Sequence, residues 1–384
     1  MKRNLFSPAN GFAVIPAAIL ILGLACGLGL SGCQTDEPET ETETAVNNDP
    51  VERPLFDETY STTTFNKSTL TYEITHLGDG VRMIKTSFTR GDGHPAEIHL
   101  VEVNLDIADV RAGAEINTGT TLRALAPYSH MMNWQEDNPG KKAMATVNGD
   151  FFAGTGTALT AQNIFVKDGF ILNDSFTASM PKSAPMLFGV KGNKAQIAPV
   201  IRYEGDISNS AVRQKIANSK ITYDGDGKVK SEDGTWDGFT TIVGGRHALI
   251  TDGEIASTVA TETSNVAESA NVPRTAIGVK GENIVVLISV ESMYYGQTGL
   301  NSLYTAADPR GQSLVQLADF CRYCGFDQAF NLDGGGSTQL LYNDGYNGSG
   351  TVKVAVRSSD GNASYSSSPT QARVIPCTLI AVTR

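Results

Sequence analysis

The 384-residue sequence has few cysteines and few histidines, five of each, and no cluster of basic residues. Its 30 lysines and arginines are outnumbered by 41 aspartates and glutamates, so the formal net charge is −11. An acidic protein without a basic surface stripe binds nucleic acid poorly, and we expect no nucleic-acid partner. The histidines are scattered without paired metal-ligand spacing, which argues against a histidine-rich metal centre.

Three cysteines fall in the part of the chain that is expected to fold: Cys321, Cys324 and Cys377. An odd number leaves at least one thiol unpaired or in an intermolecular bridge. Cys321 and Cys324 lie at the end of a predicted helix, whereas a helix lowers a thiol pKa at its start. Core packing or one disulfide is therefore favoured over a redox role.

The first 33 residues have the pattern of a bacterial lipoprotein signal. Two basic residues precede an apolar run over 11–30, and a Leu-Ser-Gly-Cys lipobox ends at Cys33. Resemblance to lipoproteins implies lipidation of Cys33 and a membrane anchor without a spanning helix; the alternative is an ordinary transmembrane anchor. Residues 34–60 follow as an acidic, disordered tether. The expected location is the bacterial cell envelope, lipid-anchored at the outer membrane and facing the periplasm or the surface.

Alternating apolar and polar residues dominate the remaining sequence and predict strands. Residues 61–94 are interpreted as an N-terminal β-hairpin extension, and residues 95–384 as the main domain. The most continuous apolar run, residues 284–290, is typical of a central strand that is buried on both faces. Asp168, in a Lys-Asp-Gly segment between two short strands, is interpreted as a turn residue.

Two helices are predicted to cover the sheet. The first spans residues 121–134 and is interrupted by Pro127, and the second spans residues 311–325 and ends at a glycine. Strands greatly outnumber helices. We therefore expect an α+β fold with a large, mostly antiparallel or mixed β-sheet core and a few covering helices.

Two polar motifs follow apolar strands. Near the C-terminal end the sequence reads Asn-Leu-Asp-Gly-Gly-Gly-Ser-Thr over residues 331–338, and Asn-Gly-Asp occupies residues 148–150. Three glycines can present backbone N–H groups to an anion and allow a substrate to approach the main chain. The alternatives are a tight hairpin turn for the first motif and a local Asx turn for the second.

These motifs, with a Gly-Gly segment at 244–245 and Pro-Arg-Thr at 273–275, resemble the phosphodiester glycosidase family in kind and order. The resemblance covers roughly residues 95–384. It implies hydrolysis of a sugar-1-phosphodiester at the anomeric C–O bond, releasing free sugar and a phosphomonoester. The expected substrates are phosphoglycans of the cell envelope or the environment, such as exopolysaccharides, with N-acetylglucosamine as a candidate sugar.

The resemblance also implies site residues. Asp333 is the first candidate for the carboxylate beside the anomeric carbon, and Glu291 and Asp150 are alternatives for the general base. The expected substrate-binding residues are Asn148, Arg246, His247, Arg274, Gly334, Gly335, Gly336, Ser337 and Thr338. Among them, Arg274, Ser337 and the three glycine amides are expected to hold the phosphate, and Asn148 and Thr338 the sugar. A divalent cation, Ca²⁺ or Mg²⁺, stays open because Asp150, Glu291 and Asp333 could converge.

Two other functions remain open. A metal-dependent phosphodiesterase would cleave the P–O bond, but it would need a cluster of metal ligands. A non-catalytic glycan-binding lipoprotein would keep the pocket without the reaction. The products distinguish the three: free sugar, sugar phosphate, or binding without turnover.

Overall fold

The computed structural model describes residues 55–119, 121–176, 185–205, 209–259, 271–291, 310–357 and 368–384. All of them belong to one compact unit, Asn47–Arg384. The predicted signal and the lipobox at Cys33 lie outside the described residues.

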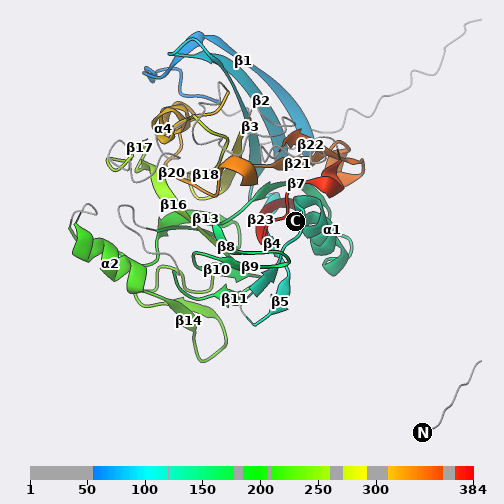
Figure 1. The fold of residues 1–384 in the computed structure, drawn as a ribbon, viewed down its shortest axis with the longest axis vertical. Coiled ribbons are helices and arrows are strands. Elements are labelled where there is room, and N and C mark those ends of the chain that lie inside the picture. The colour runs from blue at the N-terminus through cyan, green and yellow to red at the C-terminus, as the bar shows by residue number, and fades with distance from the viewer. Residues whose placement is uncertain are drawn as a thin grey trace, which may run out of the picture. The chain divides into compact units, whose positions relative to one another are not determined.

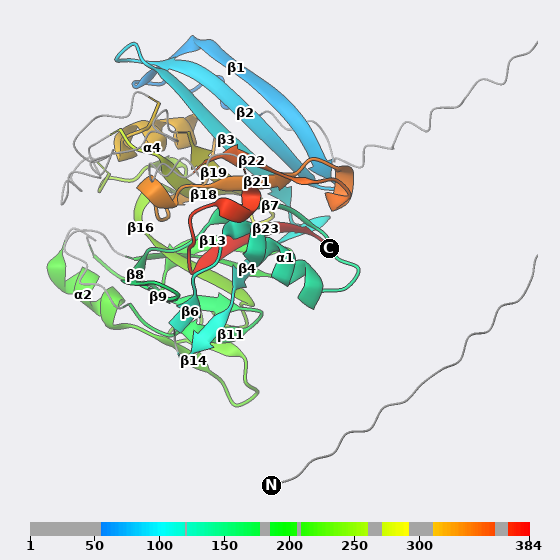
Figure 2. The same ribbon diagram turned by 45° about the vertical axis from the view of Figure 1, so that its right-hand side comes forward.

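The larger of two main sheets contains twelve of the described strands, and its strand pairs are antiparallel (Figures 1 and 2). Its main path runs through β1 (Phe65–Gly78), β2 (Val81–Arg90), β3 (Pro95–Asn104), β19 (Ile284–Val290), β18 (Arg274–Lys280), β20 (Gln328–Asn331), β16 (Thr241–Thr251), β10 (Phe165–Lys167) and β11 (Phe170–Asn173). Beside β16 lie β12 (Met186–Lys191), its partner β13 (Lys194–Pro199), and β17 (Glu254–Ile255).

The smaller main sheet has five described strands, also paired antiparallel. Its order is β22 (Val352–Val356), β21 (Leu340–Asn343), β7 (Ala143–Asn148), β23 (Cys377–Thr383) and β4 (Ala108–Ala114). Two minor sheets complete the described strands: β5 (Ile116–Thr118), β6 (Thr121–Arg123), β9 (Ala158–Ala161) and β8 (Phe152–Thr155), and the hairpin of β14 (Ile221–Tyr223) and β15 (Val229–Ser231). The predicted sheet-rich α+β class is confirmed.

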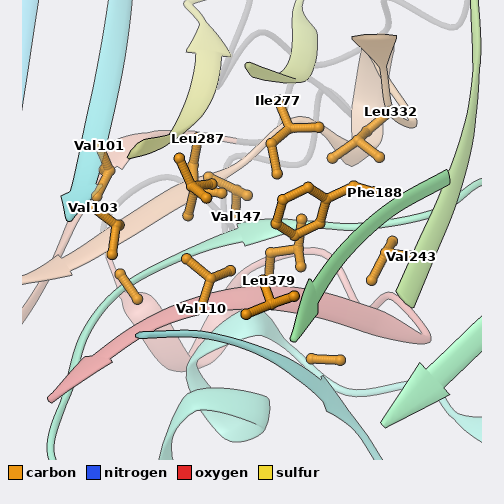
Figure 3. Close-up of a cluster of buried hydrophobic side chains, with 14 of the residues drawn as sticks. Val101, Val103, Val110, Val147, Phe188, Val243, Ile277, Leu287, Leu332 and Leu379 are labelled. Atoms are coloured by element: carbon orange, nitrogen blue, oxygen red, sulfur yellow. The ribbon is translucent and has the colours of Figure 1, made fainter. Parts of the chain in front are cut away.

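The inner faces of the two main sheets share the largest hydrophobic core. Figure 3 shows side chains from both sheets pointing toward one another: Val101, Val103, Phe188, Val243, Ile277 and Leu287 from the larger sheet, and Val110, Val147 and Leu379 from the smaller one. Each fully buried aliphatic side chain contributes about 1.5–3 kcal/mol to folding. The sheets are therefore held together by apolar packing, whereas the polar motifs lie at the ends of their strands.

The predicted central strand is confirmed as β19. All seven of its residues are buried between β3 and β18. The predicted β1–β2 hairpin also forms, but β2 continues directly into pairing with β3. The hairpin is therefore an integral part of the larger sheet and not an appended extension.

Helix α4 (Leu314–Tyr323) covers the outer face of the larger sheet, as predicted. Ser313 and Gln316 form a capping box at its start, and Gly325 has a φ of +68° just after its end. Cys321 and Cys324 pack into this core as free thiols, and Cys377 is also buried and free, so no disulfide forms within the described part of the chain.

Helix α1 (Pro127–Asp137) covers the opposite side, against the smaller sheet. The prediction of a helix that starts at residue 121 and is interrupted by Pro127 was wrong, because residues 121–123 form β6 and the helix begins at the proline. Proline fits the first helical position, where its missing N–H has no partner to lose. A third helix, α2 (Ser210–Asn218), was not predicted. No helix in the described ranges has the length and hydrophobicity to cross a membrane.

Candidate active site

The glycine-rich motif carries the chain from one main sheet to the other. It follows β20 of the larger sheet, forms a short 3₁₀ turn, η1 (Gly335–Ser337), and enters β21 of the smaller sheet. Gly335 has a φ of +59°, in the left-handed region that favours glycine. A Cβ on Gly334 would lie 3.1 Å from the carbonyl oxygen of Pro273. Glycine is therefore required by the crossing itself.

Asn148, at the end of β7, holds this crossing in place. Its Nδ2 donates to the carbonyl oxygen of Asp333 at 2.7 Å, and the Asp333 N–H donates to the Gly149 carbonyl at 3.2 Å. Its Oδ1 accepts from the Thr275 hydroxyl at 2.6 Å and from the Gln339 N–H at 3.2 Å. Asn148 is buried, so the structure gives it a positioning role where the sequence predicted a sugar contact.

Asp150, two residues beyond β7, is held by Asn163. The β8–β9 hairpin returns the chain, so that the Asn163 N–H donates to Asp150 Oδ2 at 2.8 Å and its Nδ2 donates to Oδ1. Burial raises the pKa of Asp150 to about 8, against the Asn163 hydrogen bonds and the charge of Arg246, while the charge of Asp333 raises it further. The two carboxylates thus lie within electrostatic reach of each other.

Asp333 itself is half-buried. Burial raises its pKa to about 6, while the Ser337 hydroxyl, the charges of Arg373 and Arg246, and the Gly334 N–H oppose this rise. The Gly334 N–H donates to Asp333 Oδ1 at 3.0 Å. Burial therefore favours the protonated form more strongly at Asp150 than at Asp333.

Two arginines approach the carboxylate pair. The Arg246 guanidinium lies over the Phe151 ring, 5.1 Å from its centroid, and donates to Gln162 Oε1. The Arg373 guanidinium lies 5.6 Å from the centroid of the Phe152 ring. Aromatic faces hold guanidinium groups in a fixed orientation. The site therefore pairs two acids with two cations.

His247 follows Arg246 at a bulge of β16. The register against β20 shifts between Arg246 and Ala248, and His247 has a φ of +64°. A bulge re-aims the side chains beside it. His247 is buried, and the bulge gives it and Arg246 different directions than a regular strand would.

Two of the three glycine amides that were predicted to hold an anion donate to protein oxygens. The Gly334 N–H is bonded to the Asp333 carboxylate, and the Gly335 N–H donates to the Pro273 carbonyl at 2.8 Å. The Ser337 hydroxyl likewise hydrogen-bonds the Asp333 carboxylate. Thr338 Oγ1 is buried and has no hydrogen-bond partner among the described residues.

Arg274, the first residue of β18, borders the turn that carries Asp333, because its Cα lies 3.8 Å from the place that a Cβ on Gly334 would take. Glu291 follows the last residue of β19. The Arg274 Nε donates to the Gln312 carbonyl at 2.8 Å, and the Glu291 N–H donates to the Glu97 carbonyl at 2.9 Å. In the described ranges, Asp150, Glu291 and Asp333 do not form one group of metal-ligating atoms; the Glu291 carboxylate groups with Glu97 and His99 instead. The cause is the strand order, because β18 separates β19 from β20.

The comparison with protein families identifies the chain. The phosphodiester glycosidase model matches residues 141–374, a segment that contains both aspartates of the pair. The chain belongs to the phosphodiester glycosidase family. This phosphodiester glycosidase is a hydrolase, as the sequence predicted.

Its fold is similar to that of two solved structures. The catalytic domain of zebrafish N-acetylglucosamine-1-phosphodiester alpha-N-acetylglucosaminidase, auto-inhibited by its pro-peptide, has a TM-score of 0.50 and 17% identity, with 82% of this chain and 88% of that chain covered. A Burkholderia pseudomallei protein described as exported has a TM-score of 0.53 and 11% identity, with 86% and 100% covered. At these identities the likeness concerns the fold alone. No curated protein matches this phosphodiester glycosidase in sequence.

Sequence reasoning missed Asn163 and Arg373. Asn163 was noticeable only as a polar residue directly before the apolar run of β10. Arg373 follows a polar stretch without periodicity, so no local pattern connects it to Asp333. Both become site residues only when hairpin and sheet pairing are known.

Proposed function

We propose that this phosphodiester glycosidase hydrolyses a sugar-1-phosphodiester at the anomeric C–O bond, releasing free sugar and a phosphomonoester. The observation that carries the proposal is the unequal carboxylate pair. Burial raises the pKa of Asp150 to about 8 and that of Asp333 to about 6, so one acid keeps its proton at neutral pH and the other does not. Such a pair supplies both a base and a hydrogen-bond donor.

In the proposed reaction, ionised Asp333 takes a proton from water as the water oxygen bonds to the anomeric carbon. The bond from that carbon to the phosphate oxygen breaks, and its electron pair leaves with the phosphate. Protonated Asp150 donates a hydrogen bond to the leaving phosphate and, being neutral, does not repel it. Arg246 and Arg373 offset the phosphate charge.

The proposed sugar is N-acetylglucosamine, which the zebrafish relative of similar fold carries in its name. The proposed carriers are phosphoglycans of the cell envelope or surroundings, including exopolysaccharides. The two arginines suit a negatively charged group, and the acidic chain as a whole selects against large polyanions such as nucleic acid.

The test uses N-acetylglucosamine-α-1-phosphate esters in water enriched in ¹⁸O. Label in the free sugar supports C–O cleavage, whereas label in the phosphate would assign the protein to P–O phosphodiesterases. Saturable binding without product would instead support a glycan-binding role. The variant Asp333→Asn should lose about 10²–10⁴-fold in kcat. The control Asp168→Asn makes the same chemical change at an exposed turn residue, whose φ is +52°, and should keep wild-type activity.

The proposed location is the cell envelope, with lipid on Cys33. This part of the proposal comes from the Leu-Ser-Gly-Cys pattern that ends at that residue. Wild-type cells fed radioactive palmitate should label the protein, and the variant Cys33→Ala should not be labelled. Equal labelling of both would contradict the lipid anchor.

A further inference from the structure

A second polar cluster, which includes neither aspartate of the pair, lies on the inner face of the larger sheet. It consists of Glu97 and His99 on β3 and Glu291 at the end of β19, and one ligand atom of each lies within 4.8 Å of the others. His99 Nε2 lies 3.0 Å from Glu97 Oε1. His99 and Glu291 are each only 4% exposed. Two carboxylates and an imidazole are thus gathered in a largely dry place.

The strand register explains why these side chains meet. His99 lies opposite Ser289, and Glu291 follows Ser289 by two residues, so all three side chains share one face of the sheet. Glu97 precedes His99 by two residues on that same face. Two of the three ligands therefore lie on strand β3, and the third, Glu291, directly follows the last residue of the neighbouring strand β19.

Two buried polar atoms beside the cluster lack hydrogen-bond partners in the part of the chain that the structure describes: His99 Nδ1 and Ser289 Oγ. Ser289 is fully buried, lies directly opposite His99 and precedes Glu291 by two residues on the shared face. A buried polar atom without a partner costs about 1–3 kcal/mol. Such atoms next to a set of ligands indicate a bound group that completes the site.

The donor set defines the group. Carboxylate oxygens close together attract a cation, and Lys85 Nζ, 3.4 Å from Glu97 Oε1, already supplies one positive charge at the rim. An imidazole nitrogen with two carboxylates suits Zn²⁺, whereas Ca²⁺ and Mg²⁺ prefer oxygen ligands alone. Three protein ligands leave a fourth tetrahedral position for the Ser289 hydroxyl or for water.

We propose that Glu97, His99 and Glu291 bind a Zn²⁺ ion next to Ser289. Glu97 and His99 precede residues 141–374, so two of the three ligands lie outside the segment that the family model matches. The site is a feature of this chain in addition to its glycosidase chemistry. It does not rest on the proposed reaction.

The Zn²⁺ site is connected to the aspartate pair through one row of the sheet. His99 lies opposite Ser289, Ser289 lies opposite Thr275, and Thr275 donates to Asn148, which holds Asp333. Neighbouring strands are about 4.8 Å apart, so His99 lies about 10 Å from Thr275. Zn²⁺ would therefore fix the strand ends that support the site without touching the reacting atoms.

The test is metal binding to the full-length protein without an affinity tag. Protein stripped with EDTA is titrated with ZnCl₂ by calorimetry, and the bound metal is counted by mass spectrometry. Wild type should take up about one Zn²⁺ per chain. The variants His99→Gln and Glu291→Gln should each bind Zn²⁺ at least about 100-fold more weakly than wild type. The controls are His76→Gln, at an exposed position of β1, and Glu102→Gln, whose carboxylate pairs with Arg82. Both controls should bind as wild type does.

Three results would overturn the proposal. Absence of Zn²⁺ uptake by folded wild-type protein is the first, and equal uptake by His99→Gln is the second. The third is an NMR signal of a protonated His99 ring at pH 7 with Zn²⁺ present, because the imidazolium would then occupy the place of the metal. Should His99→Gln fail to fold, Ser289→Ala and Glu97→Gln give the same comparison with less disturbance.

Discussion

Asn148 donates a side-chain hydrogen bond to the carbonyl oxygen of Asp333 across 185 positions of sequence. Asn148 is the last residue of β7 in the smaller sheet, and Asp333 lies two residues beyond the end of β20 in the larger sheet. Their bond therefore fixes the distance between the sheet ends, and with it the distance between Asp333 and Asp150. The position of the Asp333 carboxylate therefore depends on how rigidly the two sheet ends are held together.

Replacing Asn148 with alanine should therefore cost stability as well as activity. The change leaves the Asp333 carbonyl, the Thr275 hydroxyl and the Gln339 N–H without their partner, so we expect a loss of about 2–4 kcal/mol in the free energy of unfolding. Urea denaturation measures it. Thr275→Ser keeps the hydroxyl and serves as the control, with an expected loss below about 1 kcal/mol. Equal stability of Asn148→Ala and wild type would show that the junction does not depend on this bond.

The dependence of kcat/KM on pH should be bell-shaped. Activity should rise as Asp333 ionises, since burial raises its pKa to about 6, and fall as Asp150 ionises, since burial raises its pKa to about 8. Asp150→Asn removes the group that loses its proton at high pH. The variant should be slower but should no longer lose activity above pH 8. If the variant instead lost the rise of activity at low pH, Asp150 would be the base and Asp333 the group that keeps its proton.

Folding stability should also depend on Asp150. Burial raises its folded-state pKa from 3.8 to about 8, so the folded chain binds this proton more tightly than the unfolded chain. Stability from this group is then greatest below pH 4 and is lost as pH rises to about 8. Urea unfolding at pH 5 and pH 8.5 measures the loss. The free energy of unfolding of Asp150→Asn should increase relative to that of wild type as the pH rises. A difference between the two proteins that does not change with pH would contradict the raised pKa of Asp150.

Gly335→Ala should destabilise the protein by about 1–2 kcal/mol, because the φ of +59° at this position is strained for a residue with a Cβ. The matched control is Gly225→Ala, because Gly225 has no positive φ and an added Cβ there meets nothing within 4 Å. That control should change stability by less than about 0.5 kcal/mol. Thermal denaturation of the two variants measures this difference. Similar melting temperatures would show that the positive φ at position 335 does not disfavour alanine.

Local patterns were sufficient to predict some elements of the fold. The apolar run of β19 and the glycine after α4 are signals carried by neighbouring residues, and both elements form where expected. Asp333 and Asp150 each follow an apolar strand, but it was the resemblance of their motifs to the phosphodiester glycosidase family that selected them as site residues. Pro127 was misread because proline suits a helix start as well as a helix break, and only the pairing of β6 with β9 decides between them.

The partners within the site could not be read in this way. Asn163 reaches Asp150 only through the β8–β9 hairpin, and Glu291 meets Glu97 only through the register of β19 on β3. Likewise, the glycine amides were expected to face a ligand, but the crossing between sheets directs two of them to protein oxygens. Sequence spacing gives the face of a strand, whereas the neighbouring strand is chosen by the whole fold.

Strand β23 is the last of the described strands, yet it lies inside the smaller sheet, between β7 and β4. Asn148 pairs there with Thr378, so β7 lacks one of its neighbours until β23 has been synthesised and inserted. A chain still emerging from the ribosome therefore cannot assemble the junction between β7 and the Asp333 turn. The aspartate pair comes together only after β23 has been synthesised and inserted.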